Sequence, residues 1–313
     1  MSSTVPAGSE PAREAGDAIP GAVGSGPGGR AAPVEHNGDR LVRTRLLGFV
    51  SPPGANQVVD HEGRLIVRPG QGGVVLGVGP GDPADPWASD HLEPGASVVH
   101  PDSAANHALQ AFSCLGNPAT VVSGPAGGAH GLVVGKHGAT LVAFAQADLA
   151  RIAPGDAIVV DGCGVGLAIE GEPDLAIHSC SPDLLDRLVT RTADGRLRVR
   201  VVASLPAEAA AAGLGMDVAR FNIDLQVDQP PVAEAAGRLR FGDVVAVLDQ
   251  DHRFGRQIRV GWLVVGVIAH GHSVGGGHGL GMVSLLSGPA NRFALEAAPD
   301  ASLRSLVRFP WLP

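Results

Sequence analysis

Short apolar runs recur along the chain after about residue 38, and glycine or proline interrupts them at intervals of roughly eight to twelve residues. Leu46–Val50, Leu65–Val67 and Val74–Val78 are typical examples. Such spacing is more typical of an all-β sandwich or barrel than of alternating strands and helices. The pattern therefore predicts a mainly β protein with a few short helices (α+β), built as two packed β-rich barrel- or sandwich-like domains.

A turn followed by an alternating strand occurs three times, in Leu92–Val99, Ala150–Val160 and Gly237–Asp249. The second and third copies contain the pairs Gly155-Asp156 and Gly242-Asp243. Glycine can take a positive φ, and an aspartate in a turn can accept hydrogen bonds from nearby backbone N–H groups. We expect each pair to start a strand sharply. Short barrels use this device widely, so it does not establish a duplication.

Helix signals are few. Ser181-Pro182-Asp183 precedes the apolar run LLDRLV and supplies an N-cap serine, a first-turn proline and an early acid. Pro101–Phe112 and Pro206–Ala212 are the second and third predicted helices. We place a domain boundary near residue 180, which gives an N-terminal β-rich domain over 39–180 and a C-terminal β-rich domain over 181–313.

Residues 1–38 are rich in Ala, Gly, Pro and Ser and have almost no periodic apolar positions. A segment of this kind buries too little apolar surface to offset the entropy of ordering. We expect a disordered tail.

Composition narrows the function classes. The chain is 44% hydrophobic and 17% charged with a net charge of -8, and no basic run suggests a nucleic-acid partner. No apolar stretch reaches the ~18 residues of a membrane span, and no secretory signal opens the chain. Cys114, Cys163 and Cys180 form no CxxC pair, which argues against a disulfide framework and a thiolate zinc site. We expect a cytoplasmic protein that does not bind membranes.

Lys136 is the single lysine, in a chain that has no tyrosine. A GC-rich genome explains both features, because its codons favour arginine over lysine and disfavour tyrosine. A lysine that survives suggests a chemical role, since ammonium and guanidinium are not interchangeable. A leftover surface lysine is the alternative.

Nucleotide-binding patterns do not fit. A phosphate loop around Gly135-Lys136 would need Gly at 130 and Ser or Thr at 137, where this chain has His130 and His137. The dinucleotide-like strings Gly77–Asp82 and Gly162–Leu167 lack the third glycine. We expect no nicotinamide, flavin or nucleotide cofactor.

The strongest group of chemically active residues lies in Gly242–Gly281. Two carboxylates, Asp249 and Asp251, end one apolar strand and share one of its faces if the extended chain continues. A histidine lies beside them, and three further histidines follow the next strand. Such a mixture binds a divalent transition metal (Zn, Mn, Fe or Co) or performs acid–base chemistry. The predicted metal ligands are Asp249, Asp251, His270, His272 and His278. Histidines that only bond backbone or water are the alternative.

One objection applies to that group. If Arg253–Val260 is a tight connection, the aspartates lie near the turn and the histidines at the far end of the hairpin, on the order of 30 Å away. The two sets converge only if His270–His278 folds back or a second subunit contributes. We therefore give the histidines more weight than the aspartates.

Phe112–Gly138 contains a second group. A hairpin here would place Cys114 near Lys136 and His137, a setting that lowers a thiol pKa. A buried cysteine acting as a small hydrophobe is the favoured alternative. With both groups considered, the predicted catalytic residues are Lys136, His137, His252 and Cys114, and the predicted substrate-binding residues are Asn117, Ser273 and Arg256.

Several long strings resemble the domain-of-unknown-function family 4438. They are SCLGNPATVVSGPAGGAHGLVVGKHG, GDAIVVDGCGVGL, LPAEAAAAGLG with FNIDLQ, and GDVVAVLDQDHRFGRQIRVGWLVVGVIAHGHSVGGGHGLG. The resemblance spans about residues 40 to 310 and implies a two-part, mainly β bacterial or archaeal protein, without a general activity. The family's GKHGG departs here at Ala139, and its two other tight turns are represented by Ala212–Gly215 and His278–Gly281.

The leading hypothesis is an enzyme acting on a small polar metabolite, of hydrolase, lyase or isomerase type. A His/Asp pair or a divalent metal would activate water or move a proton, and Lys136 would anchor an anion, in a site between the two domains. A non-catalytic metabolite- or metal-binding protein is the alternative. A structural oligomer is the second alternative, and a homo-oligomer is compatible with the other two.

Overall fold

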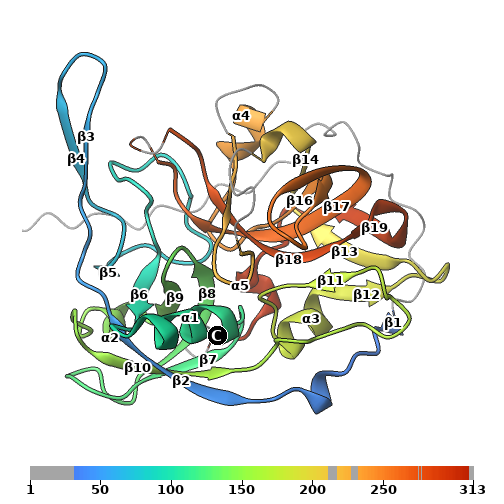
Figure 1. Ribbon diagram of the computed structural model, residues 1–313, viewed down its shortest axis with the longest axis horizontal. Coiled ribbons are helices and arrows are strands. Elements are labelled where there is room, and N and C mark those ends of the chain that lie inside the picture. Colours follow the sequence, from blue (N-terminus) through green and yellow to red (C-terminus); the bar gives the residue numbers. More distant parts are fainter. Residues whose placement is uncertain (1–31, 211–216, 227–231, 274, 276, 310–313) are drawn as a thin grey trace, which may run out of the picture.

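β-strands build most of the chain in a computed structural model that describes residues 32–210, 217–226, 232–273, 275 and 277–309 (Figure 1). The helices are short. The mainly β class with two β-rich parts, predicted from the spacing of apolar runs, is confirmed.

The N-terminal part is a closed barrel. Every pairing around it is antiparallel, and β2 pairs with both β10 and β6, so the sheet returns to its first strand. The short strand β5 (Val74–Val75) extends it beyond β6. The barrel strands are β2 (Thr44–Val50), β6 (Gly95–Val99), β7 (Pro118–Val121), β8 (His130–Lys136), β9 (Thr140–Phe144) and β10 (Ala157–Gly162).

The C-terminal part centres on a second sheet in which three long antiparallel strands lie side by side. Shorter strands pair at its edges, with β14 parallel to β16. The six strands are β11 (Ala176–Ile177), β14 (Ala203–Leu205), β15 (Ile223–Asp224), β16 (Val244–Asp251), β17 (Gln257–His270) and β18 (Gly281–Pro289).

A four-stranded sheet and a separate hairpin complete the strands. The sheet comprises β1 (Ala32–Pro33), β12 (Val189–Arg191), β13 (Leu197–Val201) and β19 (Phe293–Ala297). The hairpin of β3 (Asn56–Val59) and β4 (Leu65–Arg68) projects from the body of the molecule (Figure 1).

The end of the expected tail is ordered, which corrects the prediction for residues 32–38. Ala32 pairs with Arg191, so β1 becomes an edge strand of the four-stranded sheet. Val34 is buried in the core. The composition of this segment did not indicate that Val34 would be buried or that residues 32 and 33 would pair with the edge of a sheet. Residues 1–31, the rest of that predicted tail, lie outside the described residues.

Two of the three predicted helices are confirmed. α3 (Pro182–Leu188) is capped by the Ser181 hydroxyl, which accepts from the Leu184 N–H. α1 (Ser103–Phe112) is capped by Asp102. The described part of the third prediction forms only the 3-10 turn Ala207–Ala209, because one alanine-rich turn cannot sustain an isolated helix.

The remaining helical elements are each one to two turns long. They are the α-helices α2 (Gln146–Leu149), α4 (Val232–Ala236) and α5 (Leu303–Leu306), and the 3-10 turns Gly38–Arg40 and Ala290–Arg292.

The two Gly-Asp turns have the predicted geometry. Gly155 and Gly242 both have φ near +90° (91° and 87°). The Asp156 carboxylate accepts from the Ala153 N–H and the Asp243 carboxylate from the Arg240 N–H, so both turns are closed by the same three-residue link.

A β-bulge corrects the prediction that Asp249 and Asp251 share one strand face. Pairing between β16 and β17 shifts between Leu248 and Gln250, and Asp249 takes a left-handed φ of 52°. The extra residue breaks the alternation that the sequence argument assumed.

The barrel and the second sheet share one apolar core, which contains Val133 and Leu141 of the barrel and Val265 and Ala269 of β17. A Cβ added at Gly135 would lie only 2.8 Å from the Ala269 side chain, so β8 and β17 approach closely there. This packing brings the C-terminal ends of β8 and β17 together.

Among the described residues, no helix combines the length and the apolar character that crossing a membrane requires.

Candidate functional site

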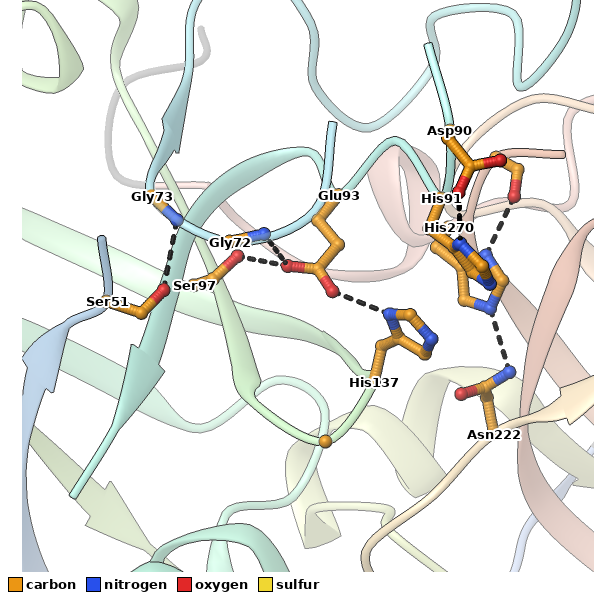
Figure 2. A network of polar contacts seen from close by, with 12 residues as sticks. Ser51, Gly72, Gly73, Asp90, His91, Glu93, Ser97, His137, Asn222 and His270 are labelled. Carbon is orange, nitrogen blue, oxygen red and sulfur yellow. Dashed lines mark hydrogen bonds and ion pairs between the residues drawn. The ribbon is translucent and has the colours of Figure 1, made fainter. Parts of the chain in front are cut away.

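Four imidazoles from four separate segments meet where β8 and β17 end. We call His91, His137, His270 and His278 the histidine cluster. Ring centroids are separated by 4.2 Å between His137 and His270, 4.8 Å between His91 and His278, and 4.9 Å between His91 and His137. Figure 2 shows three of these rings beside their polar partners.

Local backbone features place each ring. His137 directly follows β8, and His270 is the last residue of β17. A side chain at Gly281, the residue paired with His270, would collide with its imidazole, so the ring needs glycine there. His278 is held by reciprocal backbone hydrogen bonds with Ser273.

His91 has a left-handed backbone, with φ of 51°. This conformation is uncommon for a residue with a side chain, and strain of this kind is frequent at functional sites. The His91 N–H donates to the carbonyl of His272, which fixes the loop against the chain that follows β17.

Every Nδ1 atom of the cluster faces an oxygen acceptor. Carboxylates and carbonyls only accept, so each Nδ1 carries the proton and each Nε2 presents its lone pair unless it takes up a further proton. The contacts are His91 to Asp90 (2.9 Å), His137 to Glu93 (2.6 Å), His270 to the Gly271 carbonyl (2.8 Å) and His278 to the Gly279 carbonyl (3.0 Å).

Glu93 is the most deeply buried carboxylate of the site, with a side chain 1% exposed. Besides binding His137, it accepts from the Gly72 N–H at 2.8 Å and from the Ser97 hydroxyl (Figure 2). Both oxygens of this buried carboxylate therefore have hydrogen-bond donors.

Asp90 holds His91 in the same way. It also accepts from the Ser273 hydroxyl and from the Gly275 N–H. Ser273, predicted from the sequence to bind substrate, therefore lies at the edge of the cluster as a support for Asp90.

A third carboxylate, Asp224, lies 3.5 Å from Nε2 of His270 and 3.6 Å from Nδ1 of His278. The Asn222 amide donates both to Asp224 and to Nε2 of His270. Burial, followed by the charge of His137, lowers the pKa of His270 to about 4, so this fully buried ring is neutral at physiological pH.

The structure separates the predicted metal ligands, which corrects their grouping as one set. His270 and His278 belong to the histidine cluster, whereas among the described residues no ring contact joins His272 to it. Asp249 accepts from the Gly261 N–H near the hairpin turn. Asp251 forms ion pairs with Arg253 and Arg259 instead of meeting the imidazoles.

His252, predicted to be catalytic, lies in a different buried group with His178. Its Nδ1 contacts the Ser284 hydroxyl at 2.8 Å. Nε2 of His252, Nε2 of His178 and Nε of Arg256 are buried without hydrogen-bond partners among the described residues. Burial lowers the pKa of His252 to about 3 and that of His178 to about 4.

Lys136 is 0% exposed and binds partners other than the carboxylate that holds its sequence neighbour His137. Its ammonium donates to the Ser179 hydroxyl (2.9 Å) and to the Ala219 carbonyl (2.6 Å), and burial lowers its pKa to about 8. These contacts tether the segment that carries Asn222 and Asp224.

Cys114 is close enough to Lys136 to interact with its charge, as the predicted hairpin implied, but it is buried, as the favoured alternative expected. Burial raises the pKa of the thiol and outweighs the lysine. Asn117 binds the backbone of Cys114 and Cys163 through both ends of its amide. Both the oxygen and the nitrogen of the Asn117 amide, predicted to bind substrate, are thus hydrogen-bonded to the backbone.

Sequence reasoning missed five residues of the site: Asp90, His91, Glu93, Asn222 and Asp224. One signal was available in the string SDHLEPG (Ser89–Gly95), where three ionisable residues crowd into a short loop ahead of a strand. Asn222 and Asp224 carried no comparable signal.

Comparison with protein families gives two matches that cover consecutive parts of the chain. The N-terminal model of the domain of unknown function DUF4438 matches residues 57–186, and the C-terminal model matches 187–307. Comparison with curated proteins finds no match.

A solved structure described as "Crystal structure of TM1086" has a TM-score of 0.83 and 33% sequence identity, over 88% of this chain and 100% of the other. Fold, identity and the paired family matches agree. The chain belongs to the DUF4438 family.

Proposed function

We propose that this protein is an enzyme acting on a small polar metabolite, with the histidine cluster as its catalytic centre. One observation carries the proposal. Four imidazoles converge from four segments, and each has its Nδ1 held by an oxygen acceptor. A merely structural histidine needs no such common orientation, whereas a reactive Nε2 requires it.

His137 is the proposed general base. Its Nδ1 donates to Glu93, which fixes the tautomer and stabilises the imidazolium that forms when Nε2 takes a proton. The side chain remains 16% exposed, so a small substrate can reach it. This base-and-carboxylate pair supports proton transfer in hydrolase, lyase and isomerase reactions alike.

The His91–His278 pair is the proposed electrophile. The two Nε2 atoms lie 3.0 Å apart and both rings are partly exposed. A positive charge held there stabilises an oxyanion that develops on the substrate. His270 is a positioning residue, since it is fully buried and its Nε2 is already bound by Asn222.

The test is metabolite profiling with purified protein. A mixture of small polar metabolites is incubated with wild type, with His137→Gln, and with His107→Gln, a control for an exposed histidine on α1. We expect wild type and the control to consume one compound and form another, and His137→Gln to lose the conversion.

Two outcomes would contradict the proposal. Retention of a metabolite without conversion supports a non-catalytic binding protein instead. Neither conversion nor binding of any metabolite supports the structural oligomer.

A further inference from the structure

The contact between His91 and His278 poses a problem of charge. Nδ1 of His91 donates to Asp90, and Nδ1 of His278 donates to the Gly279 carbonyl. In the neutral rings both Nε2 atoms therefore carry lone pairs, and these two atoms lie 3.0 Å apart. Two lone pairs repel at that distance, so the pair requires a positive charge between the nitrogens.

Two cations can fill that place. One is an added proton, carried by either imidazole or passed to Asp90, and the other is a metal ion bound by both nitrogens. The charges of the surrounding side chains decide whether the cation is a proton, with one positive charge, or a divalent metal ion, with two.

The nearby carboxylates favour the double charge. Glu93 and Asp224 have side chains only 1% and 18% exposed. Their partners among the described residues are imidazoles, a hydroxyl, an amide and a backbone N–H, and no arginine or lysine is among these partners. Buried carboxylates without a permanent cation nearby are costly, and a divalent ion offsets that cost.

We infer that Nε2 of His91 and Nε2 of His278 bind a divalent transition-metal ion, an inference that deepens the proposed function and rests on it for its catalytic meaning. Imidazole nitrogens suit Zn, Mn, Fe and Co. With metal–nitrogen bonds of about 2.1 Å, two nitrogens 3.0 Å apart subtend an angle of about 90°.

This metal site differs in composition from the one expected from the sequence. His278 is retained and His91 is new, whereas Asp249 and Asp251 bind Gly261 and Arg253 instead. Among the described residues, no set of three or more His, Cys, Asp or Glu side chains forms a complete ligand group. The proposed site therefore has two protein ligands, His91 and His278, and water or substrate oxygens would have to fill the other positions of the ion.

The supporting residues follow the usual pattern of metal-binding histidines. A bound imidazole typically donates its other N–H to a carboxylate or a carbonyl, and loss of such a partner lowers metal affinity by about 10- to 100-fold. Asp90 and the Gly279 carbonyl fill these places. His137 is not a ligand in this arrangement and remains available as the base.

The experiment measures binding of the metal alone. Metal-free full-length protein is dialysed against Co²⁺ or Zn²⁺, its metal content is determined by elemental analysis, and Co²⁺ absorption reports ligation by nitrogen. We expect about one equivalent for wild type and for His107→Ala, a loss of at least about 10-fold in affinity for His278→Ala, and an intermediate loss for Asp90→Asn. Circular dichroism confirms that each variant is folded.

Should a variant fail to fold, wild type still decides the question through ¹⁵N NMR of its imidazoles. Nε2 signals of His91 and His278 that shift on metal addition support the inference. Less than about a tenth of an equivalent bound, with a protonated Nε2 in this pair at neutral pH, overturns it. Because binding is read without turnover, absence of bound metal would end this inference and leave the proposed enzyme standing.

Discussion

At the scale of single residues, the position of the proton on an imidazole determines which of its nitrogens can act as a base. Glu93 holds the proton of His137 on Nδ1 and leaves Nε2 as the base. Glu93→Gln keeps the volume but offers an amide that can bind the wrong tautomer. We expect the turnover number to fall by about 10²- to 10⁴-fold, the range of a general base. Glu208→Gln at an exposed position is the matched control.

Steady-state kinetics on the substrate identified by profiling provides the measurement. Unchanged turnover in a folded Glu93→Gln protein would remove the His137–Glu93 pair from the chemistry.

Buried neutral histidines also make stability depend on pH. Burial lowers the pKa of His178 to about 4 and that of His252 to about 3, from 6.5 in the unfolded chain. Below pH 6.5 the unfolded state binds more protons, so the free energy of unfolding falls as pH drops towards 4. Each group contributes a slope of up to about 1.4 kcal/mol per pH unit.

Denaturant unfolding between pH 7 and 4 checks this expectation, and His252→Gln should reduce the slope by close to one proton. A slope identical to that of wild type would mean that His252 is already protonated in the folded state.

Among single residues, the sequence predicted those site residues whose signal lies in their immediate neighbours. His137, His270 and His278 stand at strand ends among glycines, which made them recognisable. Their partners did not follow from local pattern, because His91 meets His278 across 187 positions of the chain. The loop before β6 meets the chain that follows β17 through backbone hydrogen bonds between His91 and His272 and between Gly271 and Leu92.

Among the elements, the chain segment leading into β15 depends on one buried bond. The Ala219 carbonyl accepts from Lys136, and Asn222 and Asp224 follow directly. Lys136→Met leaves that buried carbonyl without its donor, which costs about 1–3 kcal/mol. We expect faster hydrogen exchange in 217–224 and weaker catalysis through displaced Asn222.

Hydrogen exchange by mass spectrometry distinguishes this tether from the anion anchor suggested by the sequence. Substrate affinity lost by Lys136→Met with exchange in 217–224 unchanged would favour the anchor.

Turns and helix starts were predictable because their causes are local. Ser181 caps α3, and the Asp156 and Asp243 turns close as their sequences indicate. Strand partners were not predictable, since the closure of β2 onto β6 joins segments about fifty residues apart. The bulge at Asp249 was equally hidden, because nothing in its neighbours marks an extra residue.

At the scale of the whole molecule, residues 32–36 pack against the C-terminal part of the chain. β1 pairs with β12, Val34 is buried, and His36 contacts Asp186 of α3. We expect removal of residues 1–38 to lower the melting temperature by several degrees relative to removal of 1–31, since burial of one valine contributes about 1.5–3 kcal/mol. Equal melting temperatures would show that this strand adds nothing to stability.

The barrel and the second sheet meet at the site, and each contributes half of the histidine cluster. His91 and His137 belong to the N-terminal part, whereas His270 ends β17 and His278 lies in the loop between β17 and β18. The centre therefore exists only when both parts are packed together. The apolar periodicity predicted both β-rich parts, whereas their junction depends on contacts that no single segment encodes.

A double-mutant cycle on the catalytic efficiency kcat/KM tests most directly whether this cluster is one catalytic centre. His91→Gln and His137→Gln are compared singly and together on the substrate found by profiling. When residues act as a unit, the losses of kcat/KM caused by their substitution do not add. We therefore predict that the double variant has about the same kcat/KM as the less active of the two single variants. Wild-type efficiency in either folded single variant, or losses that simply add, would contradict it.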